Sequence, residues 1–177
     1  MADFSFVSRL PETITTERLV LRAPNHDHVA AMARLANSKD IYKWLSRLPH
    51  PYTKDDAIDF IDNLARSEDE HAYAIETRDG DFIGTVGLHP MHDEIEIGYW
   101  VGEPYWGEGY ASEATRALAD AAEAAGCADL RASAQSANIA SLRVLEKCGF
   151  VKTHEQTGDC GPHKGVAITY LRRERSA

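Results

Sequence analysis

The part of the sequence that most restricts the fold lies between residues 94 and 126, where a strand pattern leads through two glycines into a long helix pattern. In residues 94–101 the side chains alternate between two faces, as expected of a strand. Ile95, Ile97, Tyr99 and Val101 share one face, and Glu94, Glu96, Gly98 and Trp100 share the other. Residues 110–126 carry alanine and leucine at helical spacing and end at a glycine. Gly107 and Gly109 therefore leave the backbone open where a helix begins.

The remaining segments predict a mixed α/β fold. Asp79-Gly80 lies between two alternating segments and is a strong hairpin signal. We therefore expect an antiparallel meander whose last strand enters the glycine turn and helix, followed by a crossover to a parallel neighbour. The predicted order is strand 18–23, helices 26–37 and 53–68, strands 71–78, 81–89 and 94–101, helix 110–126, strand 129–135, helix 138–149, and strands 150–156 and 165–173.

Composition favours one globular domain over residues 1–177 and disfavours several classes of function. The net charge of −9 should repel nucleic acid. No apolar run approaches the roughly 20 residues of a membrane span, and the N-terminus lacks a signal-peptide pattern, so we expect a cytoplasmic protein without a membrane partner. Cys127, Cys148 and Cys160 are odd in number and lack zinc-site spacing, so we expect reduced thiols.

The two glycines are compatible with an anion site at a helix N-terminus, and also with a simple tight turn. A Walker loop requires Gly-Lys-Ser/Thr, whereas Tyr110 and Ala111 follow Gly109 here. A Rossmann turn would have glycine at Ser112 and a strand that runs directly into the loop. Neither of these nucleotide-binding loops fits, and the sequence has no Gly-x-Ser-x-Gly hydrolase elbow.

The segment WGEGYA, residues 106–111, resembles the pyrophosphate loop of the GNAT superfamily of acyl-CoA-dependent N-acyltransferases, written Arg/Gln-x-x-Gly-x-Gly/Ala. Trp106 departs from that pattern, because it stands at the basic or amide position. The segments TERLVLR, IEIGYWVGEPYWGEGYASEA and NIASLRVLEKCGF occur in the correct order and resemble the RimJ/RimL-like branch, the ribosomal-protein alanine N-acetyltransferases. The resemblance spans about residues 16–171. It implies the GNAT fold: a mostly antiparallel sheet of six to seven strands, splayed as a V between the fourth and fifth, with about four helices.

The same resemblance implies acetyl-CoA as co-substrate and no metal. In such enzymes the pantetheine arm lies in the V, and the pyrophosphate rests on backbone N–H groups of the glycine loop. Asn138 matches the family asparagine that contacts the cofactor arm, and it is equally suited to be a helix N-cap. The residues expected to bind acetyl-CoA are Tyr99, Trp100, Val101, Trp106, Gly107, Glu108, Gly109, Tyr110, Ala111 and Asn138.

For the chemistry, the resemblance implies direct acetyl transfer through a tetrahedral intermediate, stabilised by a backbone N–H near Tyr99 or Trp100. The acceptor must be a neutral amine, and a lysine-like amine is almost entirely protonated at pH 7, so a base is required. We expect Glu96 to be this base, acting through a water molecule, with Glu94 on the same face as the alternative. For either carboxylate, a solvated polar strand face is an equally good interpretation.

Protonation of the departing thiolate is the second expected catalytic role. Many family members use a tyrosine on the helix after the asparagine, but Leu145 stands there in this chain. Ser141 lies four residues earlier on the same helical face, and we expect its hydroxyl to serve instead. His89 and His92 have a spacing that suggests a metal site, but ordinary loop histidines are the better interpretation because no further ligands cluster with them.

The acceptor is expected to be a primary amine, either a protein N-terminus or a small molecule. Its site should lie between residues 38–52 and 157–164, with Tyr42, Trp44 and Tyr73 as lining. A non-catalytic CoA-binding or regulatory module on the same fold is the alternative function. The sequence leaves monomer and homodimer equally open.

Overall fold

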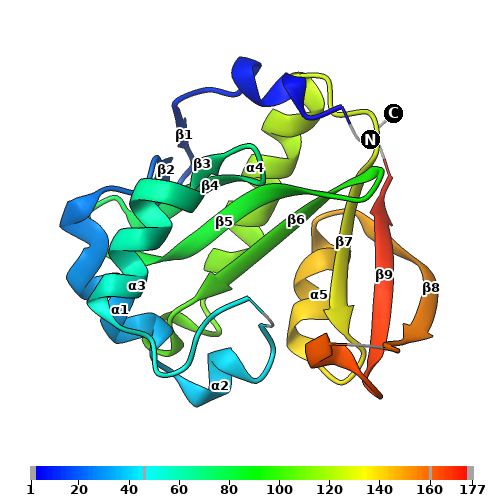
Figure 1. The fold of residues 1–177 in the computed structure, drawn as a ribbon. Helices are drawn as coiled ribbons and strands as arrows, with labels where there is room; N and C mark the ends of the chain where they lie inside the picture. The colour runs from blue at the N-terminus through cyan, green and yellow to red at the C-terminus, as the bar shows by residue number, and fades with distance from the viewer. Residues whose placement is uncertain (1–2, 46, 160, 175–177) are drawn as a thin grey trace.

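Figure 1 shows the computed structural model, which describes residues 3–45, 47–159 and 161–174. The strands are β1 (Thr13–Thr15), β2 (Leu19–Arg22), β3 (Arg66–Ser67), β4 (Glu70–Thr77), β5 (Phe82–Met91), β6 (Glu94–Val101), β7 (Leu130–Gln135), β8 (Phe150–Thr157) and β9 (Ala167–Arg173). The helices are α1 (Val29–Ala36), α2 (Lys39–Tyr42), α3 (Lys54–Asp59), α4 (Tyr110–Ala124) and α5 (Ile139–Lys147). Every predicted strand and helix has a counterpart among them, so the mixed α/β class is confirmed.

The differences from the predicted elements are local. The short elements β1, β3 and α2 are additional, and none is long enough to show a periodic pattern in the sequence. The helix predicted over residues 53–68 begins with Thr53 as its N-cap, but α3 passes into a π-helical turn at Phe60–Leu64. The chain then extends, because Arg66 pairs with His71 in a hairpin to β4.

The described strands form one nine-stranded sheet in the order β1-β2-β4-β5-β6-β7-β9-β8, with β3 beside β4. The pairing of β6 with β7 is parallel and is limited to Ile95↔Leu130 and Glu96↔Arg131. From there β7 continues along β9, as far as Gln135↔Ile168. The two strands therefore separate after Glu96, and this is the position of the predicted V.

Helices cover both faces of the sheet (Figure 1). On one face α4 packs against β2, β5 and β6, and α5 packs against β7 and β8, over a core that includes Ile97, Leu118 and Leu145. On the other face α1 packs against β5 and α3, over a smaller core that includes Met32 and Phe82. The helix α4 presents its predicted stripe to the larger core: Ala114, Leu118 and Ala125 are buried, and Ala121 is half-buried.

Three predictions concern thiols, metals and membranes. Cys127 and Cys148 are buried and form no disulfide, whereas Cys160 lies outside the described residues. Within the described ranges, no three His, Cys, Asp or Glu side chains cluster as metal ligands would. In the same part of the chain, no helix has both the length and the apolar character needed to cross a bilayer.

Candidate active site

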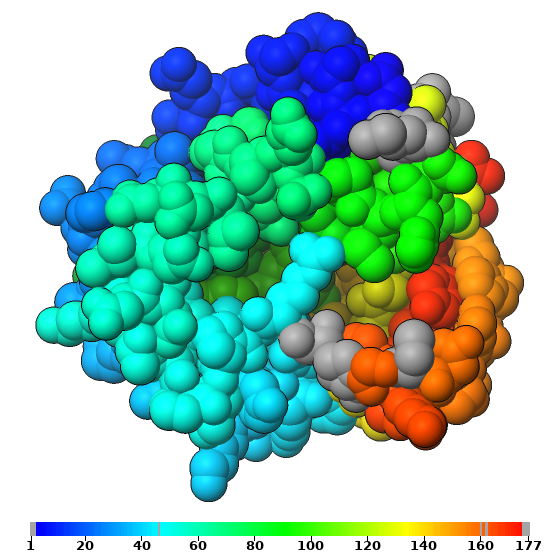
Figure 2. Space-filling model, in the orientation of Figure 1, coloured from blue at the N-terminus to red at the C-terminus, as the bar shows by residue number. Residues whose placement is uncertain are grey.

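A cavity of about 670 Å³ lies beside the opening between β6 and β7. Its floor comes from β4, β5 and β6, and the connection between α2 and α3 forms one wall. Figure 2 shows the hollow next to this cyan connection, with the green strands at its base. Residues of the loop before β9 line the other wall, so the acceptor region predicted between residues 38–52 and 157–164 coincides with a real cavity.

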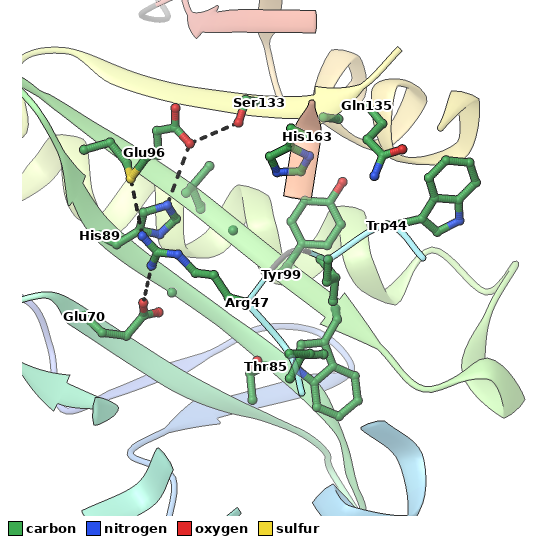
Figure 3. A pocket seen from close by; sticks show the side chains of 18 of the residues that line it. Trp44, Arg47, Glu70, Thr85, His89, Glu96, Tyr99, Ser133, Gln135 and His163 are labelled. Atoms are coloured by element: carbon green, nitrogen blue, oxygen red, sulfur yellow. Dashed lines mark hydrogen bonds and ion pairs between the residues drawn. The ribbon is translucent and has the colours of Figure 1, made fainter. Parts of the chain in front are cut away.

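Glu96 is the carboxylate that β6 directs into this cavity (Figure 3). Its side chain is only 11% exposed, and its Oε2 accepts a hydrogen bond from Ser133 Oγ at 3.1 Å. His89 Nε2 lies 3.7 Å from the same Oε2. Glu94, two residues earlier, is 43% exposed and pairs with Arg131 at 3.5 Å, outside the lining of the cavity. The geometry therefore favours Glu96 over Glu94 as the base.

The backbone of β6 alternates between its partner strand and the opening. The N–H of Gly102 donates to Ile83 on the β5 side at 2.8 Å. Because hydrogen-bonding groups alternate along a strand, Trp100 directs its backbone toward β5, whereas Ile97 and Tyr99 direct theirs toward the opening. Trp100 contributes its side chain to the cavity wall instead. The free backbone edge of β6 thus centres on Tyr99.

The Tyr99 hydroxyl reaches across the opening to α5. It lies 2.7 Å from Ser141 Oγ and donates to the Ser141 carbonyl oxygen at 3.2 Å. Burial raises the pKa of Tyr99 well above its usual value, although the hydrogen bond with Ser141 opposes this, so the phenol keeps its proton. Asn138 caps α5, since its side-chain oxygen accepts from the Ser141 N–H at 3.2 Å. Leu145 is buried in the larger core.

The glycine loop has the conformation that its sequence requires. Gly107 and Gly109 have φ of 79° and 82°, the left-handed region that favours glycine. Gly109 is the N-cap of α4 and supplies no side-chain cap. Among the described residues, no group accepts a hydrogen bond from the backbone N–H of residues 107–112. A Cβ added at Gly107 would meet nothing within 4 Å, so the loop is open to an anionic group.

A guanidinium supports the loop from beneath. Arg18 donates from Nη1 to the Glu108 carbonyl oxygen at 2.8 Å and lies 4.6 Å from the centre of the Tyr110 ring. Glu113 accepts from Arg18 Nε at 2.7 Å and from Thr16 Oγ1 at 2.7 Å. Burial tends to raise the pKa of Glu113, but the hydrogen bonds from Thr16 and Arg18 outweigh it and lower that pKa. The acidic side chain next to the loop is therefore neutralised by its own neighbours.

Trp106, which departs from the family pattern, is tied to the end of β6. Its Nε1 donates to the Val101 carbonyl oxygen at 2.6 Å, while the ring remains 48% exposed. One of the backbone oxygens at the opening is therefore already occupied.

Of the three aromatic residues predicted to line the acceptor site, two do not line the cavity. Trp44 lines the cavity. The prediction for Tyr73 is wrong: it is fully buried in the larger core, and its hydroxyl donates to Pro11, because odd-numbered residues of β4 face α4. Tyr42 does not contribute to the described lining either, since it is 45% exposed and stacks on His50.

The cavity also contains polar residues that the sequence analysis missed. Glu70 on β4 and His89 on β5 lie in it, and Arg47 from the α2–α3 connection reaches Glu70 at 3.6 Å and Met91 Sδ at 3.3 Å (Figure 3). Burial raises the pKa of Glu70, although His89 and Arg47 oppose the shift. His89 is not a loop histidine, because β5 extends to Met91. The register of the hairpin between β5 and β6 could have identified His89 as a residue of the cavity, because it places His89 opposite Glu96.

Comparison with known proteins gives consistent results. The family model described as "Acetyltransferase (GNAT) domain" matches residues 18–151. The FsC-acetyl coenzyme A-N(2)-transacetylase of Aspergillus fumigatus is 29% identical over 159 residues, and the match covers 82% of this chain and 66% of that protein.

Solved structures share the fold. An acetyltransferase (GNAT family) from Bacillus anthracis superposes with a TM-score of 0.80 at 22% identity, covering 90% of this chain and 96% of that one. RimL, a ribosomal L7/L12 alpha-N-protein acetyltransferase in complex with coenzyme A, gives a TM-score of 0.78 at 19% identity, covering 92% and 97%. At these identities the two structures support the fold alone.

Proposed function

Because the chain belongs to the GNAT acetyltransferase family, and is thus an acetyl-CoA-dependent N-acetyltransferase, we propose that it transfers the acetyl group directly to a primary amine bound beside Glu96. The observation that carries the proposal is the position of Glu96. A nearly buried carboxylate lies at the point where β6 and β7 separate, so a base, a free backbone edge and a cavity meet there.

The residues around the opening fit acetyl-CoA. The free N–H groups of residues 107–112 suit the pyrophosphate, and Arg18, itself paired with Glu113, holds the loop through its hydrogen bond to the Glu108 carbonyl oxygen. The exposed backbone of Ile97 and Tyr99 suits the amides of an extended arm, which would bind as an added strand. Acetyl-CoA supplies the acetyl thioester. The Tyr99 N–H is the best-placed donor for the thioester oxygen, since the backbone of Trp100 points to β5.

The transfer forms a bond between nitrogen and the acetyl carbon and breaks the carbon–sulfur bond. Glu96 takes the proton that the ammonium must lose, directly or through one water molecule. Its Oε2 faces Ser133 and His89, and no described side chain hydrogen-bonds to Oε1, so Oε1 is left for the amine. The nitrogen loses a second proton when the amide forms. This proton passes to the Ser141 hydroxyl as the hydroxyl gives its own proton to the departing thiolate, while Tyr99 keeps its proton and stays hydrogen-bonded to Ser141.

The charges in the cavity favour a cationic acceptor. Glu70 and Glu96 line its floor, and Arg47 is the guanidinium that faces them from the described lining. An ammonium is attracted to such a site before it loses its proton. A protein N-terminus is one candidate, suggested by RimL, the ribosomal L7/L12 alpha-N-protein acetyltransferase that shares the fold, and a small-molecule amine is the other.

The test has two stages. Acetyl-CoA at about a hundred times Kd should stabilise the protein by roughly 2.7 kcal/mol and raise Tm by several degrees, whereas NAD and ATP should not. Peptides with free N-termini and simple amines are then screened for acetyl-CoA-dependent release of free thiol. Binding without thiol release for any amine would instead favour the non-catalytic CoA-binding module.

A further inference from the structure

The cavity floor carries a row of three titratable side chains on neighbouring strands. The register places His89 on β5 opposite Glu96 on β6. On the other side, His71 pairs with Leu88, so the preceding residue of β4, Glu70, comes next to His89. Directly opposite residues of antiparallel strands point to the same face. The side chains of Glu96, His89 and Glu70 therefore share one face of the sheet, and Figure 3 shows His89 next to Glu96 and Glu70 joined to the Arg47 guanidinium.

The sheet is shaped to leave room for this row. Gly98 faces the His89 ring, and a Cβ there would lie 3.4 Å from its Cε1. Gly87 leaves space for Glu70, because a Cβ at Gly87 would lie only 2.5 Å from Glu70 Oε1. Gly98 thus leaves room for His89, and Gly87 leaves room for Glu70. His89 is 14% exposed, so its ring is mainly surrounded by protein.

We propose that His89 positions Glu96 and accepts from it the proton that Glu96 has taken from the amine. The inference rests on the proposed function. The proton moves from the ammonium nitrogen to Glu96 Oε1. A half-turn of the carboxyl group then brings the protonated oxygen to the side of His89, whose Nε2 lies 3.7 Å from the present position of Oε2, and a small approach of the two side chains transfers the proton. Glu96 returns to its carboxylate form, and the negative charges of Glu96 and Glu70 attract the imidazolium until the proton leaves to solvent.

The charged groups that face His89 come from three elements. Glu70 lies on β4, Glu96 on β6, and Arg47 on the α2–α3 connection, where its guanidinium pairs with Glu70. Two carboxylates against one guanidinium leave a local negative charge that an imidazolium would balance. Ser133 donates a hydrogen bond to Glu96, and its hydroxyl does not take up a proton near neutral pH. Among the described side chains that contact Glu96, His89 is therefore the one that can accept its proton.

The test compares His89→Ala and His89→Gln with wild type, and uses His92→Asn as the matched control. His92 lies three residues away in the β5–β6 hairpin, is exposed and has a φ of 55°, which asparagine tolerates. Both His89 variants should lower kcat by about tenfold to a hundredfold with an unchanged KM for acetyl-CoA, while His92→Asn has no effect. Added imidazole should accelerate His89→Ala and leave Glu96→Gln unchanged.

The pH profile supplies the second readout. If His89 accepts the proton, kcat should fall on the acid side of the pH profile in wild type, and this acid limb should be absent in His89→Gln. The inference is overturned if kcat stays within about threefold of wild type, if glutamine preserves both rate and profile, or if imidazole does not accelerate His89→Ala. Failure of the proposed function looks different: wild type would then bind acetyl-CoA but acetylate no amine in the screen, before any variant is compared.

Discussion

Replacing Glu96 by glutamine removes a base with almost no change of shape. The amide oxygen of glutamine can still accept the hydrogen bond from Ser133, so fold and acetyl-CoA affinity should be retained. Activity should fall, because the variant can use only acceptor molecules that are already neutral. For an amine with a pKa near 10.4, this fraction is about one in 2,500 at pH 7. We therefore expect kcat/KM for the amine to fall by about 2,500-fold at pH 7, within the usual range for loss of a general base.

The same reasoning predicts how the loss depends on pH. The neutral fraction of the amine rises tenfold for each pH unit and reaches about one in 25 at pH 9. The deficit of Glu96→Gln should therefore shrink to about 25-fold at pH 9. The assay follows release of free thiol from acetyl-CoA at saturating acetyl-CoA, with the best amine from the screen, from pH 6.5 to 9.5.

Glu94→Gln is the matched control, since Glu94 lies on the same face of β6 but pairs with Arg131 outside the cavity. Its activity should equal that of wild type. Two results would refute the reasoning: a Glu96→Gln enzyme with wild-type kcat/KM, or one whose deficit is the same at every pH. The second result would mean that Glu96 orients the acceptor and takes no proton.

Three further substitutions test other parts of the site. Gly109→Ala should weaken acetyl-CoA binding at least tenfold in calorimetry and destabilise the fold by about 1–2 kcal/mol, whereas Gly80→Ala, with φ of 92° in a distant turn, should cost stability alone. Ser141→Ala should lower kcat by about tenfold to a hundredfold without changing KM for acetyl-CoA, because Tyr99 loses its link to the thiolate. Burial raises the pKa of Glu70 in the folded protein, so folding favours its protonated form. The resulting contribution to the free energy of unfolding is fully present below the pKa of Glu70 in the unfolded chain, and it is lost as pH rises through the pKa in the folded protein. Glu70→Gln should therefore raise Tm near pH 8 and change it little near pH 4, and an unchanged Tm difference between the two pH values would contradict this.

The sequence was informative where structure depends on near neighbours. The alternation in residues 94–101, the hairpin at Asp79-Gly80 and the glycines before α4 are local patterns, and each has its predicted counterpart. The same holds for the cap at Asn138, because its side chain bonds the backbone N–H three residues ahead. The short β1, β3 and α2 were missed, since none spans enough residues for a period to appear.

The composition of the cavity could not be predicted in the same way, because it depends on which strands are neighbours. Glu70 and Glu96 are far apart in sequence, and they share a cavity only because β5 places His89 between them. Tyr73 illustrates the opposite error. An aromatic residue near the expected acceptor site was assigned to it, although the parity of its position in β4 directs the ring into the core.

The departure at Trp106 has a physical explanation of the same kind. The family pattern places a basic or amide residue there, and the loop would otherwise lack that group. In this chain Arg18, which lies just before β2, donates to the Glu108 carbonyl oxygen, and Glu113 on α4 holds it in place. A guanidinium thus contacts the loop from the segment just before β2, with its charge balanced by Glu113, and Trp106 bonds the end of β6. Contact between a basic group and the loop depends on position in space, so a substitution in the motif does not by itself remove it.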